Sequence, residues 1–306
     1  MPGPGELVIE AGAAGINFPD LLLVRGKYQD QPQPPFTPGK EAAGRVVSLG
    51  EGVTSFAVDD RVLAVVSYGG FAERVKADAI ECYPIPDAID DVTAVAAGIA
   101  YLTAWFALNE RGSFVSGETV LVTGANGGVG VAALQMIKAA GGIAIAGLTT
   151  PAKAGFCRAN GADYVVDLSG TIDKQTVTRQ LTDLGIDSVD LVLEMLGGDI
   201  FTAAIRALRF RGRCVCIGFA AGGIIPVLPV NILLMKGIAV TGFRINQYRL
   251  GMPEESARAQ AEIFDSIIAG RLAPQVMRTY PLAEARLGLE SMLKREIRGK
   301  IVLTMR

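Results

Sequence analysis

The sequence contains no histidine, only four cysteines and a single tryptophan among 306 residues. Histidine is the commonest general base and the commonest metal ligand, so other residues must take both roles here. The cysteines, Cys82, Cys157, Cys214 and Cys216, form no C-x-x-C pair, whereas a structural zinc site needs about four N, S or O ligands. We therefore expect no metal site, and we expect reduced, buried thiols in a cytoplasmic protein.

Long runs of one charge and long apolar runs are also missing. The 29 basic and 31 acidic side chains nearly cancel, and half of the residues are hydrophobic. No basic run indicates nucleic acid or an anionic membrane, so the expected partner is a small molecule. The longest uncharged apolar run, 92–108, is shorter than the roughly 20 residues of a membrane span and predicts one buried core helix.

Three regions differ in their residue patterns. Residues 1–97 are punctuated by glycine and proline between short β-type runs, which predicts a small, mostly antiparallel β domain. Residues 98–243 alternate short apolar runs with helical stretches, which predicts a doubly wound parallel sheet of α/β class. Residues 244–306 are expected to return to the first domain. The expected parallel strands are Val120–Thr123, Ile143–Ala146, Tyr164–Val166, Leu191–Leu193, Cys214–Ile217 and Ile238–Thr241.

The most informative stretch is a strand, a glycine turn and a helix. The apolar run Thr119–Val122 leads into a G-x-x-G-x-x-G turn, and a helical segment follows over Val131–Ala140. Glycine allows a sharp bend at Gly124, close approach of a pyrophosphate at Gly127 and tight helix packing at Gly130. The helix N-terminus favours phosphate, so the pattern predicts a dinucleotide site. The alternative is a tight turn that binds no ligand.

The residues after the second parallel strand indicate which dinucleotide is bound. An NAD site usually places an acidic residue about 20 residues after the first glycines, where it holds the ribose hydroxyls. Here Thr149, Thr150 and Lys153 follow the strand, and no acid is present. Hydroxyls and a positive charge suit a 2′-phosphate, so NADPH is the predicted cofactor. The alternative is that Thr150 and Pro151 start a helix and that Lys153 is solvated.

Taken in order, the motifs resemble the zinc-independent quinone oxidoreductase (zeta-crystallin-like) branch of the medium-chain dehydrogenase/reductase superfamily. The resemblance implies a Rossmann domain and a discontinuous, mostly β, GroES-like catalytic domain. It also implies hydride transfer from NADPH to quinones or to other electrophilic α,β-unsaturated carbonyl compounds. Zinc alcohol dehydrogenases of the superfamily carry a cysteine where Asn17 stands and a histidine where Lys40 stands. The matching segments are 2–6, 14–20, 38–44, 101–105, 124–130, 161–167, 218–220, 231–236 and 299–303.

The resemblance also assigns individual residues. Asn17 and Tyr28 match the substrate end of the family's cleft and are the candidate donors to the acceptor oxygen. Asn17 has the alternative of capping a helical turn, and Tyr28 of anchoring a loop. Leu168 stands where some relatives add a tyrosine to the 2′-phosphate pocket. The implied cofactor-binding residues are Thr103, Gly127, Gly128, Val129, Gly130, Thr149, Lys153, Phe219, Ala220 and Arg295.

Several alternatives stay open. Lys40 either donates a proton in an apolar cleft or points its amine at solvent or at a carboxylate such as Glu41. The family has two more strands before the position that matches Pro2. We therefore expect either that the start of the chain was assigned too far downstream or that the first domain lacks these strands. An enoyl-thioester reductase with Tyr28 as proton donor and a non-catalytic NADPH-binding protein are the alternative functions. The strand at Ile238–Gly242 suggests a homodimer that forms along a sheet edge.

Overall fold

A computed structural model describes residues 1–222, 224–294 and 296–305, and the chain in it folds into two units. The terminal unit comprises Met1–Leu102 and Ile245–Arg306, and the central unit comprises Thr103–Arg244. The sequence places the boundaries after residues 97 and 243. The last strand pairs with the first, so the expected return of the chain to its first domain is confirmed.

The sheet of the terminal unit forms around its first strand, β1 (Glu6–Ile16). One edge of β1 pairs with β2, while the other edge pairs with β4 along its first half and with β13 along its second half. Every pair in this sheet is antiparallel except β12 with β13, as the mostly antiparallel prediction requires. The other strands are β2 (Glu41–Leu49), β3 (Arg61–Val65), β4 (Arg74–Asp78), β5 (Cys82–Pro84), β12 (Val276–Pro281) and β13 (Lys300–Thr304).

Helices of the terminal unit come from both ends of the chain. The prediction of one helix over 92–108 is wrong, because the structure has two helices that break at Ala97 and Gly98. The Glu41 carboxylate causes the break: it accepts the backbone N–H of Ile99 at 2.7 Å, and a Cβ at Gly98 would lie 2.3 Å from it. The helices are α1 (Phe18–Val24), α2 (Asp91–Ala96), α9 (Ile245–Gly251), α10 (Pro253–Ile268) and α11 (Ala285–Leu293), and α3 (Ile99–Phe106) begins in this unit and ends in the central one.

The helical run Asp91–Arg111 has the length and apolar composition of a membrane span. Within its most apolar window, 78% is buried inside the protein, and core helices of water-soluble proteins meet the same criteria. The run therefore packs as core, as its sequence predicts.

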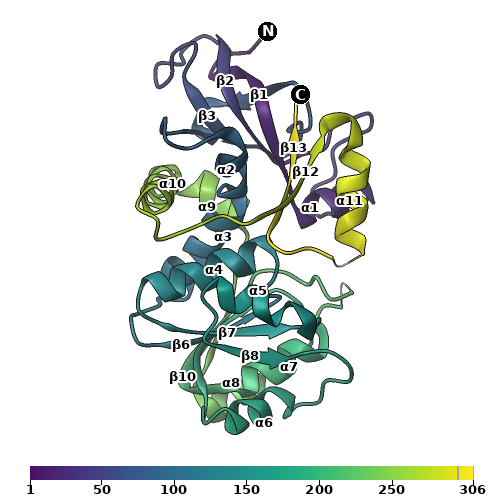
Figure 1. Ribbon diagram of the computed structural model, residues 1–306, viewed down its shortest axis with the longest axis vertical. Helices are drawn as coiled ribbons and strands as arrows, with labels where there is room; N and C mark the ends of the chain where they lie inside the picture. Colours follow the sequence, from purple (N-terminus) through teal and green to yellow (C-terminus); the bar gives the residue numbers. More distant parts are fainter. Residues whose placement is uncertain (223, 295, 306) are drawn as a thin grey trace. The chain divides into compact units, whose positions relative to one another are not determined.

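The central unit is a six-stranded sheet in the order β11-β10-β9-β6-β7-β8, and all its pairs are parallel. This is the predicted doubly wound sheet, with the change of direction between β6 and β9. Figure 1 shows α4 and α5 on one side of this sheet and α6, α7 and α8 on the other. The strands are β6 (Thr119–Thr123), β7 (Ile143–Leu148), β8 (Tyr164–Asp167), β9 (Val189–Glu194), β10 (Leu208–Cys216) and β11 (Ala239–Gly242).

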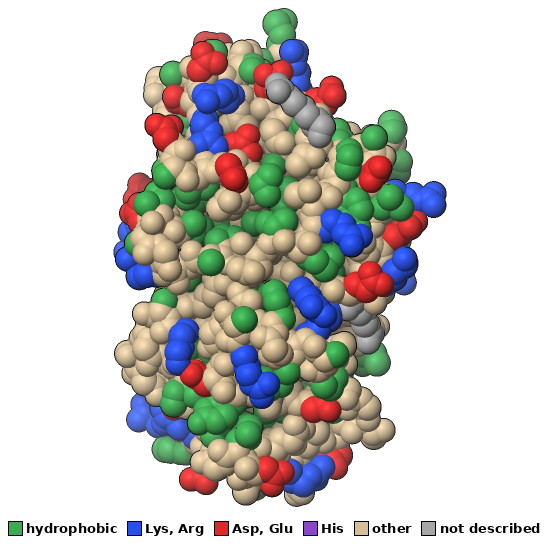
Figure 2. Space-filling model, in the orientation of Figure 1, with side chains coloured by type: hydrophobic (Ala, Val, Ile, Leu, Met, Phe, Trp, Pro, Cys, Tyr) green, Lys and Arg blue, Asp and Glu red, His purple; other side chains and the backbone are tan. Residues whose placement is uncertain are grey.

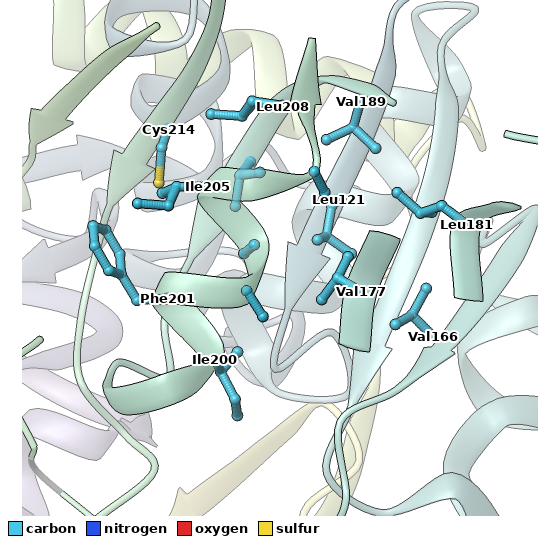
Figure 3. Close-up of a cluster of buried hydrophobic side chains, with 14 of the residues drawn as sticks. Leu121, Val166, Val177, Leu181, Val189, Ile200, Phe201, Ile205, Leu208 and Cys214 are labelled. Atoms are coloured by element: carbon cyan, nitrogen blue, oxygen red, sulfur yellow. The ribbon is translucent and has the colours of Figure 1, made fainter. Parts of the chain in front are cut away.

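The helices that cover the sheet are short and mostly apolar on one side. Side chains of α6 and α7, among them Val177, Leu181, Ile200 and Phe201, pack against the strands with Leu121, as Figure 3 shows. Strands buried on both faces read as continuous apolar runs, which explains the sequence signal. The helices are α4 (Gly128–Ala139), α5 (Ala154–Ala159), α6 (Thr176–Asp183), α7 (Gly198–Arg206) and α8 (Val230–Lys236), and Ala107–Arg111 forms a π-helical turn.

Candidate functional site

The glycine turn lies at the carboxyl end of β6, next to the point where the strand order of the central sheet reverses. Open α/β sheets bind ligands at this point. Gly124 has φ of +66°, a conformation that disfavours residues with a Cβ. Gly127 precedes the first turn of α4, whose N–H groups have no acceptor within the helix. These groups remain the predicted binding site for a pyrophosphate.

The two later glycines of the turn have different surroundings. A Cβ at Gly130 would lie 2.5 Å from Cα of Ala125 and 2.6 Å from the carbonyl oxygen of Gly124, so only glycine lets α4 approach the strand this closely. A Cβ at Gly127 would meet only the Gly124 oxygen, at 3.6 Å. Gly130 therefore serves packing, while Gly127 leaves space for a ligand. Gly128 and Val129 complete the first turn of α4.

A buried carboxylate, Glu194, lies at the end of β9 and was not singled out from the sequence. It accepts the Thr123 hydroxyl at 3.1 Å and the backbone N–H groups of Leu196 and Gly197 at 3.0 and 3.1 Å. Burial raises the pKa of Glu194, while these donors act in the opposite direction. The carboxylate thus fixes the loop after β9 to the end of β6. Its place at the carboxyl end of a central strand was the available signal.

Phe219 and Ala220 belong to the neighbouring loop after β10. The backbone N–H of Ala220 donates to the carbonyl of Met195 at 2.9 Å, and the Phe219 ring packs beside Gly197. The predicted cofactor loop and the loop held by Glu194 are therefore joined. Thr103 begins the central unit in α3 and is buried.

The end of β7 carries the hydroxyls and the lysine that the NADPH prediction uses. Thr149 and Thr150 are half-buried after the strand, and the next residues form a short 3₁₀ turn, Pro151–Lys153. Lys153 is only 6% exposed, so the alternative of a solvated lysine is wrong. No carboxylate follows the strand before Asp163. Arg295, the other predicted basic residue of this pocket, lies outside the described residues.

In the terminal unit, Asn17 is part of a buried network with Glu41 and Lys300. The Asn17 amide N–H groups donate to Glu41 at 2.8 Å and to the carbonyl of Gly15 at 3.3 Å, and its oxygen accepts from Lys300 at 2.6 Å. Lys300 also pairs with Glu41, and all three side chains are less than 9% exposed. Asn17 can therefore serve an acceptor oxygen only by giving up a partner, and its role as a donor stays a prediction. Sequence reasoning missed Lys300, which is 283 residues away from Asn17.

Lys40 lies next to Tyr28, which decides against one of its two alternatives. Its amine donates to the carbonyl of Ser67 at 2.7 Å and lies 4.4 Å from the centre of the Tyr28 ring. The side chain is 4% exposed and makes no ion pair with Glu41, so the interpretation that it points at solvent or at Glu41 is wrong. The reason is that Glu41 already has partners in Lys300, Asn17 and Ile99. Tyr28 is half-buried in the loop after α1.

Asp20, in the first turn of α1, is fully buried. One carboxylate oxygen accepts the backbone N–H of Asn17 at 2.7 Å, and the other has no hydrogen-bond partner. Burial raises the pKa of Asp20 from its ordinary value of 3.8 to about 7.

We expect this shift to make stability depend on pH. The folded protein keeps the Asp20 proton up to about pH 7, whereas the unfolded chain loses it near its ordinary pKa of 3.8. The free energy of unfolding therefore falls as pH rises through this window, on the order of 2–4 kcal/mol. Urea titrations of wild type and Asp20→Asn at mildly acidic and mildly alkaline pH measure it, because the substitution removes the titrating carboxyl group. Equal pH dependence of the two proteins would contradict the assignment.

Acidic and cysteine side chains are the available metal ligands of this chain. Within residues 1–222, 224–294 and 296–305, no group of three or more of them is placed to hold a metal ion. All four cysteines are free thiols. Cys216 is half-buried, and the other three are buried.

The fold and two family profiles together define a two-domain dehydrogenase/reductase. The profile of the alcohol dehydrogenase GroES-like domain matches residues 3–87, and that of zinc-binding dehydrogenases matches residues 128–261. Quinone oxidoreductase-like protein 2 of Bos taurus is 34% identical over 99% of this chain and 86% of its own length.

Solved structures agree with this match. A mycobacterial protein in complex with NADPH is 31% identical with a TM-score of 0.92, covering 99% of this chain and 93% of that one. Escherichia coli quinone oxidoreductase in complex with NADPH is 29% identical with a TM-score of 0.90, covering 99% and 92%. The chain belongs to the zinc-free, quinone oxidoreductase-like branch of the medium-chain dehydrogenase/reductase superfamily.

Proposed function

We propose that this protein is an NADPH-dependent, zinc-free reductase of quinones or other electrophilic α,β-unsaturated carbonyl compounds. The observation that carries the proposal is the glycine turn at the N-terminus of α4, with open space at Gly127 and tight packing at Gly130. The two NADPH complexes of similar proteins support the choice of cofactor. The bound cofactor would supply the hydride, and the chain would bind, orient and shield the reactants.

The residues present fit the cofactor. First-turn N–H groups of α4 suit the pyrophosphate, and Thr149 and Lys153 suit a 2′-phosphate. The acceptor would bind near Asn17, Tyr28 and Lys40: Lys40 lies beside the Tyr28 ring, and Asp20 accepts the backbone N–H of Asn17. Lysine, arginine and acidic side chains are interspersed on the face shown in Figure 2, which fits a small-molecule partner better than a polyanion.

The test is oxidation of NADPH with 1,4-benzoquinone as acceptor, repeated with NADH and with crotonyl-CoA. We expect turnover with NADPH and the quinone. Faster turnover of crotonyl-CoA would replace the proposal with an enoyl-thioester reductase. Binding of NADPH without oxidation by either acceptor would leave a non-catalytic binding protein.

Lys153 provides a prediction about cofactor choice. Replacing it with methionine keeps the buried stem and removes the charge, so the Kd for NADPH should rise about tenfold. The Kd for NADH should not change, since NADH lacks the 2′-phosphate. Fluorescence titration of both cofactors measures this, with the exposed Lys174→Met as the matched control. A similar loss for both cofactors would place Lys153 outside the phosphate pocket.

We also propose that two copies of the chain associate along the central sheet. Strand β11 is at the edge of that sheet, and the nearby α8 exposes Val230, Leu234 and Met235 at 68%, 87% and 78%. An open strand edge beside exposed apolar side chains suits pairing with a second copy. Light scattering should give twice the chain mass for wild type and for the Val58→Glu control, and a monomer for Leu234→Glu. A wild-type monomer would refute the association.

A further inference from the structure

The buried amine of Lys40 is the most unusual group of the terminal unit. An ammonium has three N–H donors, and one of them is used by the Ser67 carbonyl at 2.7 Å. The Tyr28 ring covers the amine from 4.4 Å. Within the part of the chain that the structure describes, no carboxylate lies at ion-pair distance from Lys40. A cation that is buried without such a partner is poised to lose its proton.

The charges around Lys40 come from several elements. Asp20 of α1 favours the ammonium, whereas Arg249 of α9 opposes it. Burial is the largest effect and lowers the pKa of Lys40. Glu41, the next residue along β2, does not help because Lys300 pairs with it. Arg249 itself is bound to Glu81 at 2.8 Å.

Lys40 also has the right neighbours for a proton donor. Tyr28, one predicted partner of the acceptor oxygen, touches its amine directly. Asp20, which influences Lys40 electrostatically, also holds the backbone of Asn17, the other predicted partner. A donor must lie within hydrogen-bond reach of the atom it protonates, and an acceptor oxygen held beside the Tyr28 ring would bring that atom to the Lys40 amine.

We propose that Lys40 donates the proton in the reduction and that Asp20 is a positioning residue whose ionised form favours that proton on Lys40. This inference rests on the proposed reductase function. The acceptor gains a hydride, supplied by NADPH, at carbon or at one quinone oxygen, and gains the Lys40 proton at an oxygen. NADPH becomes NADP⁺, the acceptor becomes the reduced alcohol, enol or hydroquinone, and the neutral Lys40 amine regains a proton from water.

Substitution of Lys40 separates a proton donor from a structural cation. Lys40→Met should lower kcat about 100-fold with benzoquinone, the lower range of general acid catalysis. Lys40→Arg keeps the charge and the donors but does not release a proton, so it should not restore kcat. NADPH binding should be unchanged in both variants. Lys27→Met, an exposed lysine just before Tyr28, is the matched control.

The pH profile tests Asp20 in its positioning role. Wild-type kcat should fall as pH rises and Lys40 loses its proton. Asp20 is ionised above about pH 7, and its charge there favours the ammonium. In Asp20→Asn this charge is missing, so the fall should begin at lower pH. In Lys40→Arg it should disappear. A purely structural role of Asp20 would change kcat at all pH values and leave the profile in place.

A measurement that needs no turnover separates the proposed role of Lys40 from the proposed reductase function. Competitive acetylation of the cofactor-free protein over a pH series, read by peptide mass spectrometry, reports when each amine loses its proton. Lys40 should become reactive at lower pH than the exposed lysines, and at still lower pH in Asp20→Asn. Full kcat in Lys40→Arg, or ordinary titration of the amine, overturns the role of Lys40. Absence of NADPH oxidation by wild type with any acceptor overturns the proposed function itself.

Discussion

Replacing Gly130 with valine is expected to abolish NADPH binding. Even a Cβ there would lie 2.5 Å from Cα of Ala125 and 2.6 Å from the Gly124 oxygen, and both are backbone atoms that cannot rotate away. The N-terminus of α4 must then move off the strand, and its N–H groups no longer converge on a pyrophosphate. We expect the Kd for NADPH to rise at least a hundredfold, with a loss of stability of about 1–3 kcal/mol from overpacking.

Two other glycines of the central unit are the controls for Gly130. A Cβ at Gly155 in α5 would meet no atom within 4 Å, so Gly155→Ala should bind NADPH normally and gain about 0.4–1 kcal/mol of stability. Gly127→Ala meets only one oxygen at 3.6 Å, so it should fold as wild type and still bind NADPH more weakly. Calorimetric titration and thermal unfolding measure both effects. A Gly130→Val protein with normal affinity would show that the turn does not hold the cofactor.

Replacing Lys300 with methionine is expected to be the most destabilising change in the terminal unit. Lys300 is the only cation bonded to the Glu41 carboxylate among the described residues, and Glu41 is 0% exposed. Breaking a buried pair leaves one charge without compensation, which costs about 3–5 kcal/mol. Asn17 also loses the donor to its oxygen. The break between α2 and α3 should loosen as well, since Glu41 accepts the Ile99 N–H.

Chemical denaturation measures the free energy of unfolding of Lys300→Met, and a double-mutant cycle with Glu41 isolates the contribution of the pair. Adding Glu41→Gln removes the stranded charge, so the double variant should recover much of the loss. Lys138→Met is the control, because Lys138 pairs with Asp163 at the surface with its side chain 55% exposed, and that pair should contribute less than about 1 kcal/mol. If Lys138→Met and Lys300→Met lowered the free energy of unfolding equally, burial of the pair between Lys300 and Glu41 would not add to its stabilising effect.

Much of the central unit could be predicted because its signals are local. A strand, a glycine turn and a helix are consecutive in the chain, and the apolar runs of a sheet buried on both faces are visible without a partner. The missing carboxylate after β7 is likewise a local fact. The bounds of the strands were harder to predict. The run expected at Cys214–Ile217 belongs to the longer β10, Leu208–Cys216. Glu194 was overlooked because its importance comes from the strand beside it.

The sequence by itself determined the class of fold, the position of the dinucleotide turn and the absence of histidine ligands, because each depends on residues close together in the chain. Only the tertiary structure decided what the polar side chains of the terminal unit do. Lys300 meets Glu41 across 259 residues, and that contact takes Glu41 away from Lys40. Lys40 then lies under Tyr28, with Asp20 as its nearby carboxylate. The partner of a buried charge depends on which groups lie near it in space and on how far it is removed from water. Neither can be deduced from the spacing of residues along the chain.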